Sequence, residues 1–356
     1  MSAAAHLSPA TRYLDLAGGH GLESGERLSE VRVGYRTWGR LDRAGGNAVL
    51  VCHALTGSAD ADRWWGGLIG PGRAFDSSED FIVCSNVLGS CYGTTGPTSR
   101  RPTDGRPWGS NFPAVTVRDM VGVQARLLDA LGVRRLRLVI GGSLGGMQAL
   151  EWAASFPDRM EAIVALATCG RHSAWCIGLS EAQRQAIRSD PKWRGGCYPE
   201  ADPPVLGLAV ARMMAMCTYR SRESFAVRFP TPTRRTGEFE VASYLRHQGE
   251  KLADRFDANC YLTLTRAMDT HDLGRGRGEY GAVLRSITAP ALVVAIDSDV
   301  LYPPAEQEEL ARLLPHAHLA RLPSPHGHDA FLTETSAVNT LVRLFRDEAR
   351  AARIAV

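Results

Sequence analysis

A serine flanked by glycines stands between an apolar run and a helix-forming run. Residues 136–140 are Leu, Arg, Leu, Val and Ile, residues 141–145 read Gly-Gly-Ser-Leu-Gly, and residues 147–154 are mostly good helix formers. Strand, sharp turn and helix in this order are typical of a nucleophile elbow, in which the turn holds a serine hydroxyl clear of the sheet. Ser143 is therefore the candidate nucleophile. The alternative is a glycine-rich turn that binds nothing.

A serine hydroxyl is a poor nucleophile near neutral pH, so it needs a base and a group that orients that base. In a nucleophile-elbow enzyme the chain order is nucleophile, acid, histidine, with the last two on loops after late strands. The apolar run 291–296 leads into a loop that holds Asp297 and Asp299. We favour Asp299 because it lies deeper in its loop.

A histidine pair follows the last predicted strand. Residues 318–322 lead into a loop with His326 and His328. We favour His328 because Gly327 lets the chain turn just before it. His53, beside the predicted site, is taken as a residue that packs its loop.

An oxyanion hole needs two backbone N–H donors. Leu144, the residue after the nucleophile, supplies one. The loop after the buried strand 47–52 supplies the other, and Leu55 is the best candidate there. Leu55 could equally be an ordinary apolar loop residue.

Apolar runs and amphipathic runs alternate through most of the chain, which predicts an α/β protein. The predicted strands are 28–38, 47–52, 81–84, 136–140, 162–167, 291–296 and 318–322, and the predicted helices of this part are 116–131, 147–154, 306–314 and 336–351. Residues up to about 18 are interpreted as a lead-in. We predict an α/β-hydrolase fold, with a mostly parallel central sheet flanked by helices.

The alternation stops in the middle of the chain. Residues 171–279 give helix-like stretches without strands, of which 206–216 is the clearest. We therefore predict a core domain made of residues 1–170 and 280–356, with a helical lid insertion at 171–279.

Composition and charge exclude several classes of protein. The chain of 356 residues is 44% hydrophobic and 22% charged, which is ordinary for a globular protein. A net charge of +3 gives no reason to expect nucleic acid or a membrane as partner, and no apolar run approaches the roughly 20 residues of a membrane helix. Residues 1–16 do not read as a signal peptide. The eight cysteines form no C-x-x-C pair, so we expect no metal site and a reduced, cytoplasmic protein.

Four segments together resemble the homoserine O-acyltransferase (homoserine O-acetyltransferase) family of the α/β-hydrolase class. They are 53–57 (His-Ala-Leu-Thr-Gly), 86–97 (beginning Asn-Val-Leu-Gly-Ser-Cys-Tyr), 142–148 (Gly-Ser-Leu-Gly-Gly-Met-Gln) and 327–332 (Gly-His-Asp-Ala-Phe-Leu). The likeness runs from about residue 31 to residue 332. Family members often carry Met where this chain has Leu144, which leaves the backbone N–H unaffected but puts the acyl pocket in doubt.

The resemblance implies a catalytic triad of Ser143, Asp299 and His328, with the Leu55 and Leu144 N–H groups at the oxyanion. It implies acyl transfer from acetyl-CoA, as co-substrate, to the γ-hydroxyl of L-homoserine by a ping-pong reaction in methionine biosynthesis. It also implies a homodimer built through the helical insertion and no metal or other cofactor.

The resemblance further points to Arg212, Tyr219 and Asp329 as contacts of the amino acid, and we add Thr56 as a substrate contact. The chemistry agrees, because the planar guanidinium of Arg212 matches a carboxylate and Asp329 could hold an ammonium. Arg212 and Tyr219 are seven residues apart, which places them on one face of a helix. An ion-paired or solvated arginine is the alternative for Arg212.

Three alternatives in function stay open from the sequence. An esterase would carry the same triad, and a binding protein could use the same fold without catalysis. A closer alternative keeps the mechanism but uses succinyl-CoA as donor or L-serine as acceptor. The amino-acid contacts and the long insertion favour a transferase, and we favour acetyl as the acyl group. No motif indicates which residues bind the CoA phosphates.

Overall fold

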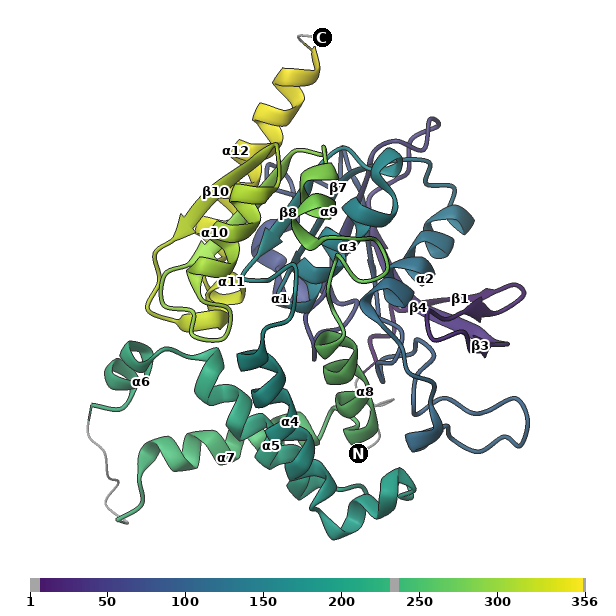
Figure 1. The fold of residues 1–356 in the computed structure, drawn as a ribbon, viewed down its shortest axis with the longest axis vertical. Helices are drawn as coiled ribbons and strands as arrows, with labels where there is room; N and C mark the ends of the chain where they lie inside the picture. The colour runs from purple at the N-terminus through teal and green to yellow at the C-terminus, as the bar shows by residue number, and fades with distance from the viewer. Residues whose placement is uncertain (1–6, 231–236, 355–356) are drawn as a thin grey trace.

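The computed structural model describes residues 7–230 and 237–354, and an eight-stranded sheet forms its centre (Figure 1). In spatial order the strands are β1 (Arg12–Leu16), β4 (Val31–Trp38), β6 (Phe81–Ser85), β5 (Ala48–Cys52), β7 (Leu136–Gly142), β8 (Ile163–Leu166), β9 (Ala291–Ile296) and β10 (Ala317–Leu322). The six strands from β6 to β10 in this order run parallel to one another. At the other edge β4 pairs antiparallel with β6, and β1 pairs antiparallel with β4. The predicted mostly parallel sheet is confirmed.

Helices cover both faces of the sheet (Figure 1). One face packs against α2 (Val117–Ala130), α3 (Leu144–Ser155), α9 (Tyr280–Ser286) and α10 (Pro304–Leu313). The other face packs against α1 (Ala61–Trp64), the short 3-10 helix η2 (Gly66–Leu68), α11 (Ala330–Thr333) and α12 (Thr335–Ile354). The remaining 3-10 turns are η3 (Gly109–Asn111), η4 (Pro157–Arg159), η5 (Pro191–Gly196) and η6 (Gly327–Asp329).

Strand β5 shows why both layers are needed. All five of its residues are buried, and their side chains alternate between the two faces. Val49 and Val51 belong to the core under α12, while Leu50 and Cys52 belong to the core under α2 and α3. A strand that is apolar on both sides is stable only between two covering layers.

The interpretation of the first 18 residues as a lead-in is wrong for Arg12–Leu16, which form the edge strand β1. Its residues pair with β4 from Arg12 opposite Tyr35 to Leu16 opposite Val31. Only Leu16 of the strand is buried, so the apolar alternation that marks inner strands is absent here. The predicted strand 28–38 also divides, because Arg27–Leu28 (β3) pairs instead with His20–Gly21 (β2) in a small hairpin.

Between β8 and β9 the described residues form helices and no strand of the sheet (Figure 1). These helices are α4 (Ala174–Arg188), α5 (Val205–Tyr219), α6 (Arg222–Arg228), α7 (Glu240–Ala253) and α8 (Ala258–Asp269), followed by α9. The two ends of this stretch meet: Arg171 and Asp272 form an antiparallel bridge, and the His172 N–H donates to the His271 carbonyl at 2.9 Å. The division into a core and a lid remains a prediction, although this pairing gives the helices a common base.

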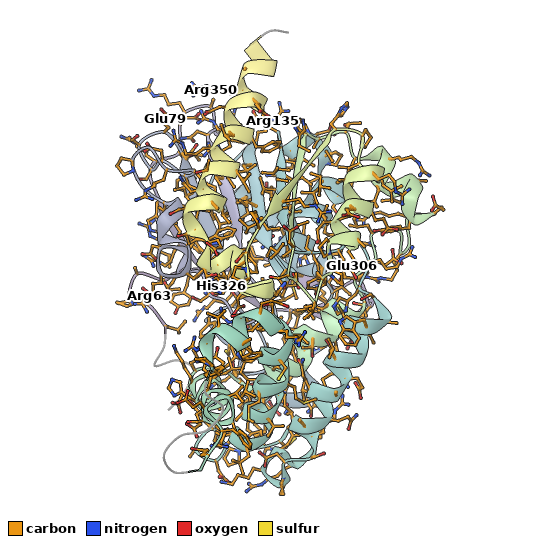
Figure 2. The ribbon with its side chains drawn as sticks, turned by 90° about the vertical axis from the view of Figure 1, so that its left-hand side faces the viewer. Arg63, Glu79, Arg135, Glu306, His326 and Arg350 are labelled. Atoms are coloured by element: carbon orange, nitrogen blue, oxygen red, sulfur yellow. The ribbon has the colours of Figure 1, made fainter. Side chains whose placement is uncertain are left out.

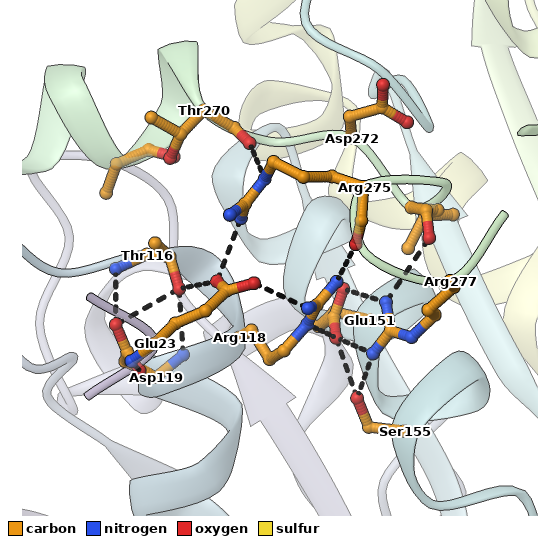
Figure 3. A network of polar contacts seen from close by, with 12 residues as sticks. Glu23, Thr116, Arg118, Asp119, Glu151, Ser155, Thr270, Asp272, Arg275 and Arg277 are labelled. Atoms are coloured by element: carbon orange, nitrogen blue, oxygen red, sulfur yellow. Dashed lines mark hydrogen bonds and ion pairs between the residues drawn. The ribbon is translucent and has the colours of Figure 1, made fainter. Parts of the chain in front are cut away.

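A polar network ties α3, the helix that follows Ser143, to the segment between α8 and α9 (Figure 3). Glu151 of α3 is buried and accepts from Arg118 of α2 and from Arg277 at 3.1 Å each. Arg118 also pairs with Glu23, to which Arg275 donates at 2.9 Å. Burial disfavours the charged carboxylate of Glu151, but the hydrogen bonds from Arg277 and Ser155 and the charges of Arg277 and Arg118 together outweigh it. The pKa of Glu151 therefore lies below its usual value.

Candidate active site

Ser143 occupies a strained turn between β7 and α3. Its φ of 57° and ψ of −125° lie where a residue with a Cβ is rarely found. A Cβ on Gly141 would lie 2.3 Å from the carbonyl carbon of Gly145, and one on Gly145 would lie 2.2 Å from the Cys52 oxygen. The glycines are therefore required by the close crossing of β5, β7 and α3. The turn is held by the Thr168 hydroxyl, which donates to the Ser143 carbonyl at 2.8 Å.

The carboxylate of Asp299 and the ring of His328 form a buried pair. Nδ1 of His328 lies 2.7 Å from Oδ2 of Asp299, and each residue is 3% exposed. The other oxygen, Oδ1, accepts from the backbone N–H groups of Leu301 at 2.8 Å and Tyr302 at 3.0 Å. A carboxylate oxygen can only accept a hydrogen bond, so Nδ1 of the neutral ring carries the proton that faces Asp299. Nε2 of the ring is then the nitrogen that can accept a proton.

The pKa of His328 lies above its usual value. Burial acts against the charged ring, but the charge and hydrogen bond of Asp299 outweigh burial, and Asp329 adds to the effect. An imidazolium formed during a proton transfer is therefore stabilised where it forms.

Aromatic rings fix the position of His328. Its ring centroid lies 5.3 Å from that of Tyr302, 5.5 Å from Phe331 and 5.7 Å from Tyr219. Phe331 also packs against the turn of the nucleophile, because a Cβ on Gly142 would lie 2.5 Å from its ring. Among the described residues no hydrogen bond joins the Ser143 hydroxyl to His328, a contact that commonly tightens only with substrate.

The two residues that competed with this pair in the sequence lie at the surface. The Asp297 carboxylate is 45% exposed and pairs with Arg321 at 3.1 Å. His326 is 43% exposed, with Nε2 3.8 Å from Glu334, and Figure 2 shows it where the α/β part meets the helices of the middle of the chain. The geometry thus brings Asp299 and His328 together and leaves Asp297 and His326 apart from them.

The loop that carries Leu55 is a tight turn braced by His53. The Gly57 N–H donates to the Ala54 carbonyl at 2.8 Å, and Nδ1 of His53 lies 2.8 Å from the same oxygen. Nε2 of His53 accepts from the Val87 N–H at 3.1 Å, so the proton is on Nδ1. Burial lowers the pKa of His53 to about 4, which keeps the ring neutral at physiological pH. His53 packs its loop, as expected, and also holds it by hydrogen bonds.

Thr56 is held by an arginine that the sequence analysis did not single out. Arg255, just after α7, donates through Nη1 to the Thr56 carbonyl at 2.8 Å and to the Tyr92 hydroxyl at 2.6 Å. Its Nη2 lies 3.4 Å from the Thr56 hydroxyl. The helices of the middle of the chain therefore brace the loop of Leu55. No sequence signal could reveal a contact between residues so far apart along the chain.

The predicted amino-acid contacts gather beside His328. The Arg212 guanidinium lies over the Tyr219 ring, 4.9 Å from its centroid, as expected for two residues on one face of α5. Oδ2 of Asp329 lies 3.5 Å from Nε of Arg220. Arg220, which the sequence analysis missed, therefore gives Asp329 a cationic partner within the chain. Burial raises the pKa of Tyr219, so its phenol stays protonated and can donate a hydrogen bond.

Within residues 7–230 and 237–354 no group of three or more His, Cys, Asp or Glu side chains could hold a metal ion. All eight cysteines are free, and six of them are buried. Among the helices of the described residues, none combines the length and apolarity needed to cross a bilayer.

Comparison with known proteins agrees with this architecture. A family model described as the α/β-hydrolase fold matches residues 47–335. The protein is therefore a member of the α/β-hydrolase class, in agreement with its sheet and with the turn that carries Ser143. A homoserine O-acetyltransferase of Chloroherpeton thalassium is 60% identical over 327 residues, which are 92% of this chain and 86% of that relative. The chain belongs to the homoserine O-acetyltransferase family.

Two solved structures share the fold. The homoserine O-acetyltransferase from Bacillus anthracis superposes with a TM-score of 0.88 at 26% identity, covering 95% of this chain and 98% of that chain. Esterase E22 superposes with a TM-score of 0.87 at 28% identity, covering 94% and 99%. The same scaffold therefore carries proteins named as a transferase and as a hydrolase, and the distinction must come from the site.

Proposed function

We propose that this protein transfers an acetyl group from acetyl-CoA to the γ-hydroxyl of L-homoserine through an acyl-serine at Ser143. The observation that carries the proposal is the buried Asp299–His328 pair, which contacts the turn of Ser143 through Phe331. Relatives that are 59–60% identical and named homoserine O-acetyltransferase support the choice of reaction.

In the first half-reaction Ser143 attacks the thioester carbonyl of acetyl-CoA. Nε2 of His328 takes the hydroxyl proton, and Asp299 keeps the ring in the required tautomer. The Leu55 and Leu144 N–H groups hold the negative charge that develops on the carbonyl oxygen. His328 then returns the proton to the CoA sulfur, and the acetyl group stays on Ser143.

In the second half-reaction homoserine takes the place of CoA. Arg212 binds its carboxylate as a planar fork, with Tyr219 beside it, and Asp329 binds its ammonium group. Arg220 partners Asp329 before the ammonium arrives, since the two side chains lie 3.5 Å apart. Thr56 lines the acceptor site. His328 removes the γ-hydroxyl proton as the oxygen attacks the acyl-serine. The bond between the acyl carbon and Oγ of Ser143 then breaks, His328 returns the proton to Oγ, and O-acetylhomoserine leaves.

An esterase is the second candidate, because esterase E22 has the same fold at 28% identity. The acyl-serine would then be attacked by water instead of homoserine. The placement of Arg212, Tyr219 and Asp329 beside His328 favours an amino-acid acceptor over water. Succinyl-CoA as donor or L-serine as acceptor would use the same mechanism.

Product analysis separates these candidates. Purified protein is incubated with acetyl-CoA alone, with acetyl-CoA and homoserine, and with acetyl-CoA and serine, and then with succinyl-CoA in the same series. We expect O-acetylhomoserine from one mixture and little acetate from any. Equal acetate release with and without homoserine would identify a hydrolase and overturn the proposal.

We further propose that the reaction needs no metal or other cofactor, serves methionine biosynthesis in the cytoplasm, and is carried out by a homodimer. Exposed apolar side chains on α5 support the last point: Leu206 is 72% exposed and Val210, one turn on, is 44% exposed. A second copy that covered them would bury this apolar strip.

A further inference from the structure

A chain of buried side-chain amides ends at the two segments proposed to form the oxyanion hole. The Trp152 indole donates to Oε1 of Gln124 at 2.8 Å, and Nε2 of Gln124 donates to Oε1 of Gln148 at 2.7 Å. Nε2 of Gln148 then donates to the His53 carbonyl at 3.2 Å and to the Leu144 carbonyl at 3.1 Å. The first three side chains are at most 2% exposed.

The direction of this chain is determined at both ends. An indole nitrogen can only donate, so Gln124 must present its oxygen to Trp152 and its NH₂ group to Gln148. Gln148 must then present its NH₂ group to the two carbonyls, which can only accept. A flipped amide at either glutamine would place donor against donor or oxygen against oxygen, so a single arrangement satisfies every group.

Gln148 thereby links two separate parts of the chain through one nitrogen. The His53 carbonyl precedes the turn that carries Leu55, and the Leu144 carbonyl belongs to the residue that supplies the other proposed donor. We infer that Gln148 is a positioning residue, which sets the spacing between the Leu55 and Leu144 N–H groups. The inference rests on the proposed function, because it assumes that these groups bind the oxyanion.

A change in the spacing of these two N–H groups should affect the rate of the chemical step more than the binding of substrate. Oxyanion-hole donors act on charge that develops in the transition state, and their effect depends on distance. A shift of one donor should lower kcat in both half-reactions, since both pass through a tetrahedral oxyanion. It should leave the KM values for acetyl-CoA and homoserine nearly unchanged.

The test compares a Gln→Met substitution at two adjacent residues of this hydrogen-bonded chain, Gln148 and Gln124. Gln148→Met removes both hydrogen bonds to the carbonyls, whereas Gln124→Met removes a link farther from the site and leaves them intact. Removing a whole oxyanion donor costs about 10²- to 10³-fold in kcat, so a displaced donor should cost roughly 10- to 100-fold in Gln148→Met. Gln124→Met should lose a comparable amount of thermal stability but keep kcat within about threefold. The hydrogen bonds of Gln124 go to Trp152, Gln148 and the Cys52 sulfur, and not to the Leu55 loop or to Leu144. Equal kcat losses in the two variants, or an unchanged kcat in Gln148→Met, would overturn the inference.

A second variant gives a readout that a merely structural role would not move. Gln148→Glu keeps the size and the acceptor oxygen, and it regains one O–H donor when its carboxyl is protonated. The ratio of its kcat to that of the parent protein should rise as pH falls, because protonation of His328 affects both proteins and cancels. A ratio that does not change with pH would overturn the inference. A parent protein without CoA release would instead refute the proposed function before any variant is compared.

Discussion

Nδ1 of His328 and Oδ2 of Asp299 lie 2.7 Å apart in the interior, while the neighbouring His326 and Asp297 are at the surface. The two surface residues provide natural controls, because they have the same chemistry within two positions of the buried pair. If Asp299 orients the His328 ring and stabilises its charged form, substitutions of these two residues should affect catalysis, and substitutions of His326 and Asp297 should not.

We therefore expect His328→Ala to lower kcat/KM for homoserine by roughly 10⁴- to 10⁶-fold, and Asp299→Asn by about 10⁴-fold. His326→Ala and Asp297→Asn should remain within a fewfold of the parent protein. Steady-state assays of CoA release check all four variants. A dead Asp297→Asn variant beside an active Asp299→Asn variant would refute the assignment of the acid but not the class of reaction.

The pH dependence follows from the raised pKa of His328. The ring must be neutral to accept the Ser143 proton, so kcat/KM for acetyl-CoA should fall as pH drops through that raised pKa. In Asp299→Asn the charge that raises the pKa is gone while burial, which lowers it, remains. The acidic limb of the profile should then move to lower pH, although the rate is far smaller. An acidic limb that stays in place would show that another group controls it.

Arg212 should serve the acceptor and not the acyl donor. A charge-assisted bidentate contact contributes about 1.5–3 kcal/mol, so Arg212→Ala should lower kcat/KM for homoserine by roughly 10- to 150-fold. Release of CoA in the first half-reaction should stay nearly normal, and Arg212→Lys should recover only part of the loss. Rapid-mixing assays measure the two halves separately.

The control for this test is Arg194→Ala, which removes an arginine paired with Asp202 at the surface. It should leave both half-reactions unchanged. Equal damage to both halves in Arg212→Ala would mean that Arg212 is structural or contacts CoA.

Glu151 should stabilise the fold. Glu151→Gln leaves Arg118 and Arg277 without their shared carboxylate, which should lower the free energy of unfolding by about 3 kcal/mol near neutral pH. The pKa of Glu151 is lower in the folded chain than its usual 4.5. The stabilisation is therefore complete above that value and is lost as pH falls through the folded pKa, so the two proteins should converge in acid.

Denaturant unfolding at several pH values measures this effect. Glu308→Gln, which removes an exposed ion pair with Arg321, is the control and should change the unfolding midpoint far less. A Glu151→Gln variant as stable as the parent protein at neutral pH would contradict the account.

The sequence predicted the parts of the fold and site that depend on local pattern. Continuous apolar runs revealed the inner strands, and the loops after β7, β9 and β10 hold the candidate residues where the chain order placed them. The edge strand β1 was not predicted, because only Leu16 of its residues is buried and the strand therefore lacks an apolar pattern.

Long-range contacts could not be predicted in the same way. Arg255 reaches Thr56 and Arg220 reaches Asp329 only because the helices between β8 and β9 fold back over the sheet. Gln148 was visible as part of a family motif, but its two carbonyl partners depend on how closely β5 and α3 approach. These contacts follow from packing, which no local residue pattern encodes.

The most direct test of the account is the mass of the intact protein after brief exposure to acetyl-CoA alone. We predict one added acetyl group that peptide mapping places on Ser143, that is absent in Ser143→Ala, and that transfers to homoserine when it is added. An acetyl group on a cysteine, or an acetyl-Ser143 that homoserine does not discharge faster than water does, would contradict acyl transfer through Ser143.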